Sequence, residues 1–272
     1  HSADMFDPAT LRGKRVVVVG AGASAMDNAA AALEAGCARL DLLARRPKLP
    51  VIDKFTGTGS RGMTAGYVGL PDAAKWALMD EGDRFPVPPP KHSVERVARH
   101  AHAHLHTGAA IQAIEARADG LRITTPRGVI EADVAIFATG FGIALADRPE
   151  LSHVAPHIRT WGDVVGPEKA AMNPVLAAHP YLAPDFAFTE KTPGTCSALS
   201  RLLCFAYAAV PSHGKVTSGI PSATEGARRL ASGLTRSFFA EDAAQHLDRF
   251  RAYDTPDMDE NIWPPVDLVP TA

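Results

Sequence analysis

The sequence predicts an α/β fold in which a parallel sheet, with a β-meander beside it, is followed by a mostly helical or irregular C-terminal part. Three observations support this prediction. A strand, a glycine-rich turn and a helix follow one another over residues 15–35, short apolar segments alternate with turn signals over 111–141, and helical periodicity returns after residue 222. We place one domain at 11–140 and the C-terminal part at 141–272.

The first unit begins with a run of four valines, Val16 to Val19, which is typical of a buried strand. The helix that follows, about residues 24–35, carries Met26, Ala30 and Leu33 on one stripe and is ended by Gly36. A second, mostly buried strand is expected over residues 39–44. Strand, helix and strand in this order predict the start of a parallel sheet.

The turn between this strand and helix reads Gly20-Ala21-Gly22-Ala23-Ser24-Ala25. It matches the pattern G-x-G-x-x-[GA] of a Rossmann-like dinucleotide site, in which Gly20 permits the tight turn and Gly22 lets the backbone approach a pyrophosphate. Ala25 is the small residue that lets the helix pack on the strand. The free N–H groups at Ala23 and Ser24, with the Ser24 hydroxyl, favour a phosphate there.

Two arginines, Arg45 and Arg46, follow the second strand. A site selective for NADH would carry an acid here for the ribose 2′-hydroxyl, whereas a 2′-phosphate requires cations. Asp41 stands at the beginning of the strand, several residues short of that position. We therefore predict NADPH as the ligand, and two solvated surface arginines are the alternative.

Residues 47–91 are rich in Gly and Pro, and we expect loop there apart from one helix near 71–83, with Ala74, Leu78 and Met79 inward. The loop either covers a ligand or is a disordered excursion. Residues 85–90 should run extended, and a helix follows near 93–101.

Four histidines then stand at alternate positions, His100, His102, His104 and His106. On a strand they would share one face and could bind zinc or copper, but no carboxylate or cysteine completes a ligand set. We therefore predict a partly exposed surface run and no metal site.

Short strands over 111–116, 121–125 and 129–130 form the predicted meander, and a buried strand over 133–138 follows. That strand ends in Ala138-Thr139-Gly140, which taken alone indicates only a core strand and a turn. Farther on, a helix should start at Ser222 and another should span 241–253. Their expected inward side chains are Ala227, Leu230, Ala231, Leu234 and Phe238 in the first, and Leu247 and Phe250 in the second.

Together these segments resemble the flavoproteins with two dinucleotide sites, in particular the flavin-containing and Baeyer–Villiger type monooxygenases. The resemblance covers most of the chain. It implies that the glycine turn opens an NADPH domain, that Arg45 and Arg46 bind the 2′-phosphate, and that Ala138, Thr139 and Gly140 mark the crossing back to an FAD domain. It further implies that Gly219 and Ile220 lie where a helix N-terminus faces the flavin, although an ordinary loop before an ordinary helix is an equal alternative.

Such enzymes begin with an earlier glycine turn that holds the FAD pyrophosphate, and none precedes Arg15 in this chain. Because the chain also starts at His1 without methionine, we expect a fragment that lacks about 150 residues, one domain's worth. The resemblance implies an oxidoreductase in which NADPH reduces FAD and the reduced flavin reacts with O2, while this chain alone binds NADPH and catalyses little. The catalytic residues stay unknown. The alternative is a non-catalytic NADP-binding sensor or regulatory module.

Composition argues against other classes of function. Lys and Arg total 28 against 30 Asp and Glu, so no basic excess indicates nucleic acid. No apolar run reaches the roughly 20 residues of a membrane span, and no signal peptide opens the chain. Three cysteines without C-x-x-C or metal spacing suit a reducing compartment, so we expect a cytoplasmic protein. Its expected partners are NADPH, a small-molecule substrate, and either the missing FAD-binding half or a second copy.

Overall fold

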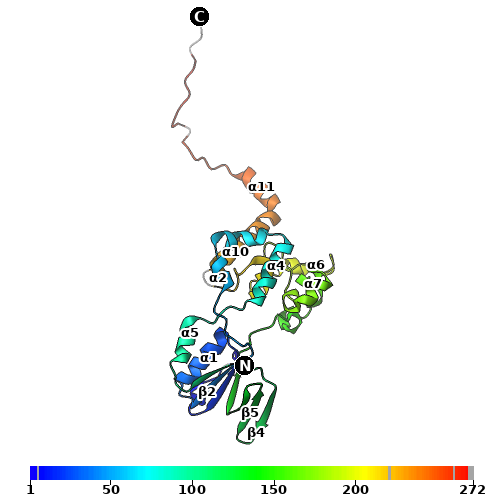
Figure 1. Ribbon diagram of the computed structural model, residues 1–272. Helices are drawn as coiled ribbons and strands as arrows, with labels where there is room; N and C mark the ends of the chain where they lie inside the picture. Colours follow the sequence, from blue (N-terminus) through cyan, green and yellow to red (C-terminus); the bar gives the residue numbers. More distant parts are fainter. Residues whose placement is uncertain (5, 220–221, 260, 269–272) are drawn as a thin grey trace.

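Four parallel strands form the main sheet, in the spatial order β3-β2-β1-β7 (Figure 1). They span Arg15–Val19 (β1), Arg39–Ala44 (β2), Ala103–Thr107 (β3) and Val134–Phe137 (β7). The valines of β1 pair with β2 on one side and β7 on the other, and Val16, Val17 and Val18 are buried. The parallel sheet expected from the sequence is therefore confirmed. The computed structural model describes residues 1–4, 6–219, 222–259 and 261–268.

The two faces of this sheet are covered differently. Helices α1 (Ala23–Glu34) and α5 (Lys91–Ala98) lie on one face, where Met26 and Leu33 of α1 pack with Val97 of α5 in a common core. The predicted meander is confirmed as a separate three-stranded antiparallel sheet of β4 (Ala113–Arg117), β5 (Gly120–Thr125) and β6 (Gly128–Ala132). Its Ile123 packs with Val17 and Leu43 on the other face. These elements form the sheet unit.

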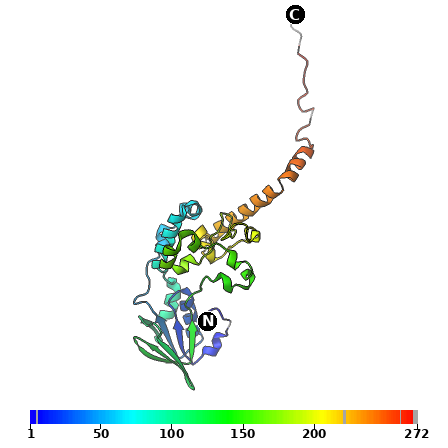
Figure 2. The same ribbon diagram turned by 90° about the vertical axis from the view of Figure 1, so that its right-hand side faces the viewer.

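A helical unit stands beyond the ends of the strands (Figures 1 and 2). Residues 47–91 contribute three helices to it: α4 (Asp72–Arg84), which confirms the helix predicted near 71–83, and α2 (Lys54–Thr58) and α3 (Arg61–Gly66), where loop was expected. The second half of the chain contributes α6 (Trp161–Val165), α7 (Pro167–Met172), α8 (Pro174–Ala177), α9 (Val210–His213) and α10 (Ser222–Glu241). Short 3-10 helices join these elements, at Tyr67–Gly69, Leu145–Asp147, Pro149–Leu151, Ala155–His157, Ser197–Arg201 and Tyr207–Ala209, and one more, Pro8–Leu11, precedes β1 in the sheet unit.

The core of the helical unit explains why the loop expectation was wrong at α2 and α3, because Phe55 and Met63 pack against it. Trp76 and Met79 of α4 pack with Trp161 and Val210, which come from distant parts of the chain. Trp161 is fully buried, and its indole Nε1 donates a hydrogen bond to the Ser212 hydroxyl at 3.0 Å. Leu78, expected to face inward, is 43% exposed, because the buried face of α4 passes through Trp76 and Met79. Residues 85–90, predicted to run extended, form neither helix nor strand between α4 and α5.

Helix α10 starts at Ser222 as predicted but packs through glycines rather than through its apolar side chains. Gly226 and Gly233 are its buried residues, and a Cβ on Gly226 would lie 2.2 Å from the Val216 carbonyl oxygen. Leu230 and Leu234 are half-buried as expected. The other side chains expected to face inward are exposed, which corrects the prediction: Ala227, Ala231 and Phe238 in α10, and Leu247 and Phe250 in α11 (Ala243–Ala252). The end of α10 and α11 form an arm that leaves the two units (Figure 2), which explains the exposure of Phe238, Leu247 and Phe250 among the described residues.

Candidate functional site

The glycine turn joins the end of β1 to the start of α1, as the pattern predicts. Gly20 has a φ of +131°, a conformation that side chains strain to adopt. A Cβ there would lie 2.3 Å from the carbonyl oxygen of Ala138, which follows β7. Gly20 is therefore required for the contact that brings the turn and the Ala138-Thr139-Gly140 segment together.

The remaining small residues of the turn divide into packing and exposed positions. Ala25 is fully buried, 3.4 Å from the position of a Gly20 Cβ, which fits its predicted place between helix and strand. Gly22, Ala23 and Ser24 are exposed, and no atom lies within 4 Å of the position of a Gly22 Cβ. The turn thus leaves open space over its backbone at Gly22.

The N-terminus of α1 offers unused hydrogen-bond donors at this open space. Gly22 is the N-cap and supplies no side-chain cap, and the first helical bond runs from the Met26 N–H to the Gly22 carbonyl oxygen at 3.1 Å. The N–H groups of Ala23, Ser24 and Ala25 precede that bond, so they lie at the positive end of the helix dipole. This geometry is suited to a phosphate group.

Arg45 and Arg46 follow β2 directly, and both side chains are exposed. Their backbone is held in place because the Gly108 N–H donates to the Arg46 carbonyl oxygen at 2.7 Å. No carboxylate among the described residues pairs with either guanidinium. Both cations are therefore available to a ligand at the carboxyl end of β2.

Asp41 lies away from the carboxyl end of β2, as the sequence suggested. It is 1% exposed, both of its oxygens accept hydrogen bonds from Arg39 (2.7 and 3.0 Å), and His106 Nε2 lies 2.7 Å from Oδ1. Burial opposes ionisation, but these hydrogen bonds hold the pKa of Asp41 below its ordinary value. The carboxylate is thus engaged within the sheet rather than facing a ribose.

His106 and its neighbours do not form a metal centre in the part of the chain that the structure describes. His104 and His106 lie on β3, whereas His100 and His102 precede it, so the helix-to-strand transition breaks the common face. Within the same residues, no helix combines the length and apolar character that crossing a membrane requires.

Two further glycine segments lie apart from the turn. Gly219 contacts Ser222 and Lys215 of the helical unit, and its carbonyl oxygen accepts from the Ala223 N–H at 2.8 Å. Ile220, predicted beside it, lies outside the described residues. A second match to the glycine pattern, residues 57–62, joins the short helices α2 and α3 with no strand before it, so it lacks strand–turn–helix geometry.

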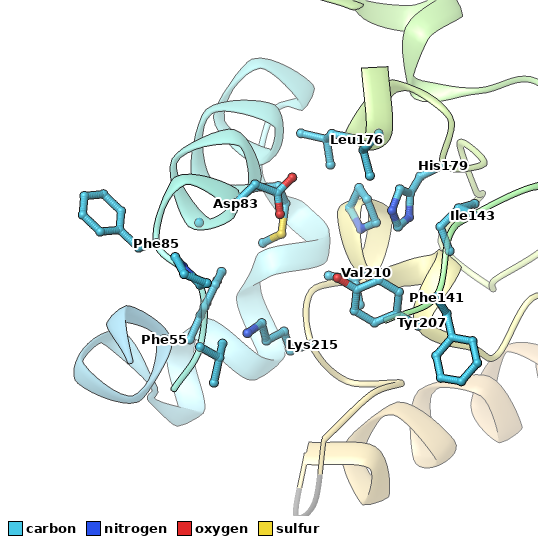
Figure 3. A pocket seen from close by; sticks show the side chains of 16 residues that line it. Phe55, Asp83, Phe85, Phe141, Ile143, Leu176, His179, Tyr207, Val210 and Lys215 are labelled. Carbon is cyan, nitrogen blue, oxygen red and sulfur yellow. The ribbon is translucent and has the colours of Figure 1, made fainter. Parts of the chain in front are cut away.

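A cavity of about 290 Å³ lies between two of the three chain segments that link the units, residues 85–90 and 138–144, and we call it the hinge cavity (Figure 3). Phe85 follows α4, and Phe141 and Ile143 follow Gly140. No sequence pattern marks this cavity, because its walls come from segments far apart in the chain. Its apolar lining includes Phe55, Phe85, Phe141, Val175, Leu176 and Val210.

No protein-family model matches the chain. It is 32% identical over 264 residues to an FAD-dependent urate hydroxylase of Xanthomonas campestris pv. campestris, an alignment that covers 97% of this chain and 56% of that protein. The chain therefore spans little more than half the length of this curated relative.

The solved structures support the fold. Ornithine hydroxylase from Pseudomonas aeruginosa matches with a TM-score of 0.55 at 15% identity, over 82% of this chain and 52% of the hydroxylase. Its reduced form matches with a TM-score of 0.54 at 14% identity, over 84% and 54%. At these identities the similarity concerns the fold alone.

Proposed function

The chain is related to the FAD-dependent hydroxylases and monooxygenases and covers only part of such proteins, and we propose that it is the NADPH-binding portion of a flavin-dependent monooxygenase. In the intact enzyme, NADPH would reduce FAD and the reduced flavin would react with O2. The NADPH assignment rests on the open N-terminus of α1 together with two exposed arginines at the end of the adjacent strand.

The roles of the residues follow from their positions. The N–H groups of Ala23 and Ser24 would bind the pyrophosphate, and the open space at Gly22 would admit it. Arg45 and Arg46 would bind the 2′-phosphate, because a guanidinium donates two parallel hydrogen bonds to phosphate oxygens. Thr139 and Gly140 are exposed beside the turn and would border the same ligand.

FAD would supply the redox chemistry of the intact enzyme. The described residues offer it no second strand–turn–helix cradle, and the carbonyl oxygen of Gly219 is engaged by the start of α10. We therefore assign the FAD pyrophosphate site to the part of such enzymes that this chain does not cover. This chain alone is expected to bind NADPH and to consume little of it.

The test is the double variant Arg45→Ala with Arg46→Ala, compared with Arg127→Ala in the exposed β5–β6 turn. Nucleotide affinity is measured by fluorescence titration with NADPH and with NADH. The double variant should lose at least about tenfold in NADPH affinity and far less in NADH affinity, because the loss is confined to contacts with the 2′-phosphate. Equal losses for the two nucleotides would reject the assignment.

A visible absorption spectrum after incubation with FAD and gel filtration tests the second part of the proposal. A colourless protein agrees with an FAD site outside this chain, and a retained flavin band contradicts it. Addition of the FAD-binding half should then restore NADPH oxidation. Nucleotide binding without oxidation in that mixture would favour the non-catalytic sensor module instead.

A further inference from the structure

The hinge cavity carries polar side chains that none of the roles above uses. Figure 3 shows Asp83, His179, Tyr207 and Lys215 around one space, contributed by α4, the segment after α8, the 3-10 helix Tyr207–Ala209 and the segment after α9. Four polar groups converge on a cavity whose remaining walls are largely aromatic and aliphatic. Concave apolar sites with a few convergent polar groups are typical of small-molecule binding.

Lys215 is the cation of this cavity. Its ammonium lies 3.5 Å from the centre of the Phe55 ring, and that ring is wedged against Gly82, where a Cβ would lie 2.5 Å from it. Among the described residues, no carboxylate oxygen lies within 4.0 Å of the ammonium. Burial lowers the pKa of Lys215, although the more distant carboxylates of Asp53 and Asp83 oppose this shift. An anionic group in the cavity would add a direct counter-ion.

His179 provides a hydrogen-bond acceptor on another wall. It is 4% exposed, and its Nδ1 lies 3.0 Å from the Ala208 carbonyl oxygen, so Nδ1 carries the hydrogen. Because burial also lowers the pKa of His179, the ring is neutral and Nε2 is left as an acceptor. Asp83 adds carboxylate oxygens, one of which accepts from the Asn173 amide at 3.1 Å. A ligand in this cavity would therefore need a hydrogen-bond donor to pair with His179 or Asp83.

We propose that the hinge cavity binds a small aromatic or heteroaromatic acid that also carries an N–H or O–H donor. The acid group pairs with Lys215, the donor faces His179 or Asp83, and the ring contacts the aromatic walls. A volume of about 290 Å³ lies just below the range typical of small-molecule sites, about 300–1,000 Å³, and suits a single substituted ring. This site is separate from the glycine turn and does not depend on the NADPH assignment.

The test is isothermal titration of the chain with para-aminobenzoate, benzoate and para-aminobenzamide. The wild-type chain should bind para-aminobenzoate saturably and more tightly than benzoate, which lacks the donor. Lys215→Met should weaken para-aminobenzoate by about tenfold or more and leave para-aminobenzamide unchanged, because the amide has no charge to lose. Lys215→Gln removes the charge but keeps a polar side chain, and it should weaken para-aminobenzoate in the same way.

Lys54→Met is the matched control, since the Lys54 ammonium also lies over an aromatic ring, Phe85 at 4.5 Å, but lines a neighbouring cavity. It should leave all three affinities unchanged. The Arg45→Ala, Arg46→Ala variant should also keep the affinity for para-aminobenzoate, which separates this site from the nucleotide site. Absence of saturable binding, or equal losses in the Lys54 and Lys215 variants, would overturn the proposal, as would an equal loss for acid and amide.

Discussion

The glycine turn makes one sharp prediction, because its two glycines are required for different reasons. At Gly20 the φ of +131° and the 2.3 Å separation between a Cβ and the Ala138 carbonyl oxygen both oppose any side chain. Gly22 has a φ of −91°, and a Cβ there meets no atom within 4 Å. Gly20→Ala should therefore damage the fold, whereas Gly22→Ala should damage only the binding of a ligand.

The magnitudes follow from these two geometries. A non-glycine residue held in a sparsely populated backbone region costs about 1–3 kcal/mol. Displacing the end of β7 to relieve the overlap at Ala138 costs a similar amount, so Gly20→Ala should lower the free energy of unfolding by about 2–6 kcal/mol. Gly22→Ala changes only the N-cap, which should cost less than about 1 kcal/mol.

Urea unfolding followed by far-ultraviolet circular dichroism measures the first effect, and titration with NADPH measures the second. We expect a lower unfolding midpoint for Gly20→Ala and a near-native midpoint with weakened NADPH binding for Gly22→Ala. Equal midpoints for the two variants would refute the reasoning about Gly20. Unchanged NADPH affinity in Gly22→Ala would refute the position assigned to the pyrophosphate.

Three further predictions concern buried polar and glycine positions. Burial lowers the pKa of His213 from its ordinary 6.5 to about 4, so the unfolded chain binds a proton at this imidazole more tightly than the folded chain does. The stability that the neutral His213 contributes above pH 6.5 is therefore lost as the pH falls towards 4. His213→Gln should flatten the free energy of unfolding over that range, and equal slopes would contradict the prediction. Asp41 is buried, but hydrogen bonds from a neighbouring arginine and histidine hold its pKa below the ordinary 3.8, so its contribution is present above that pH and is lost in stronger acid. Asp41→Asn should abolish this acid-dependent loss and cost about 1–3 kcal/mol at neutral pH in urea unfolding. Gly226→Ala should lower the thermal midpoint, because its Cβ would overlap the Val216 carbonyl oxygen, although alanine favours helix over glycine by about 1 kcal/mol. Ser232→Ala, at an exposed position of the same helix, is the control and should leave the midpoint unchanged.

Local patterns predicted the sheet unit well. The valine run, the glycine turn and the helix stripe through Met26 and Leu33 are neighbours in sequence and remain neighbours in space. The helix near 71–83 was predicted, but α2 and α3 were missed because their Phe55 and Met63 pack against a core whose Trp161 comes from far along the chain. An apolar stripe does not identify the buried face of a helix that packs through glycine. The buried face of α10, which carries Gly226 and Gly233, was therefore predicted wrongly.

The same division applies to the candidate sites. The glycine turn and the two arginines after β2 are contiguous motifs with a known physical rationale, and the sequence places them at the correct ends of their elements. Asp83, His179 and Lys215 stand in three separate segments with no fixed spacing. Only the packing of α4 against the second half of the chain gathers them around one cavity.

The tilted pair of Trp76 and Trp161, whose ring centres are 6.4 Å apart, has a consequence for how the protein is made. During synthesis, α4 emerges from the ribosome well before its partner, and the strands β3 to β7 are translated between them. The apolar side chains of α4 must therefore stay without native partners while the sheet unit is completed. Folding of the helical unit waits for long-range contacts, which are slow to form, and nascent α4 is the segment on which we expect chaperones to act.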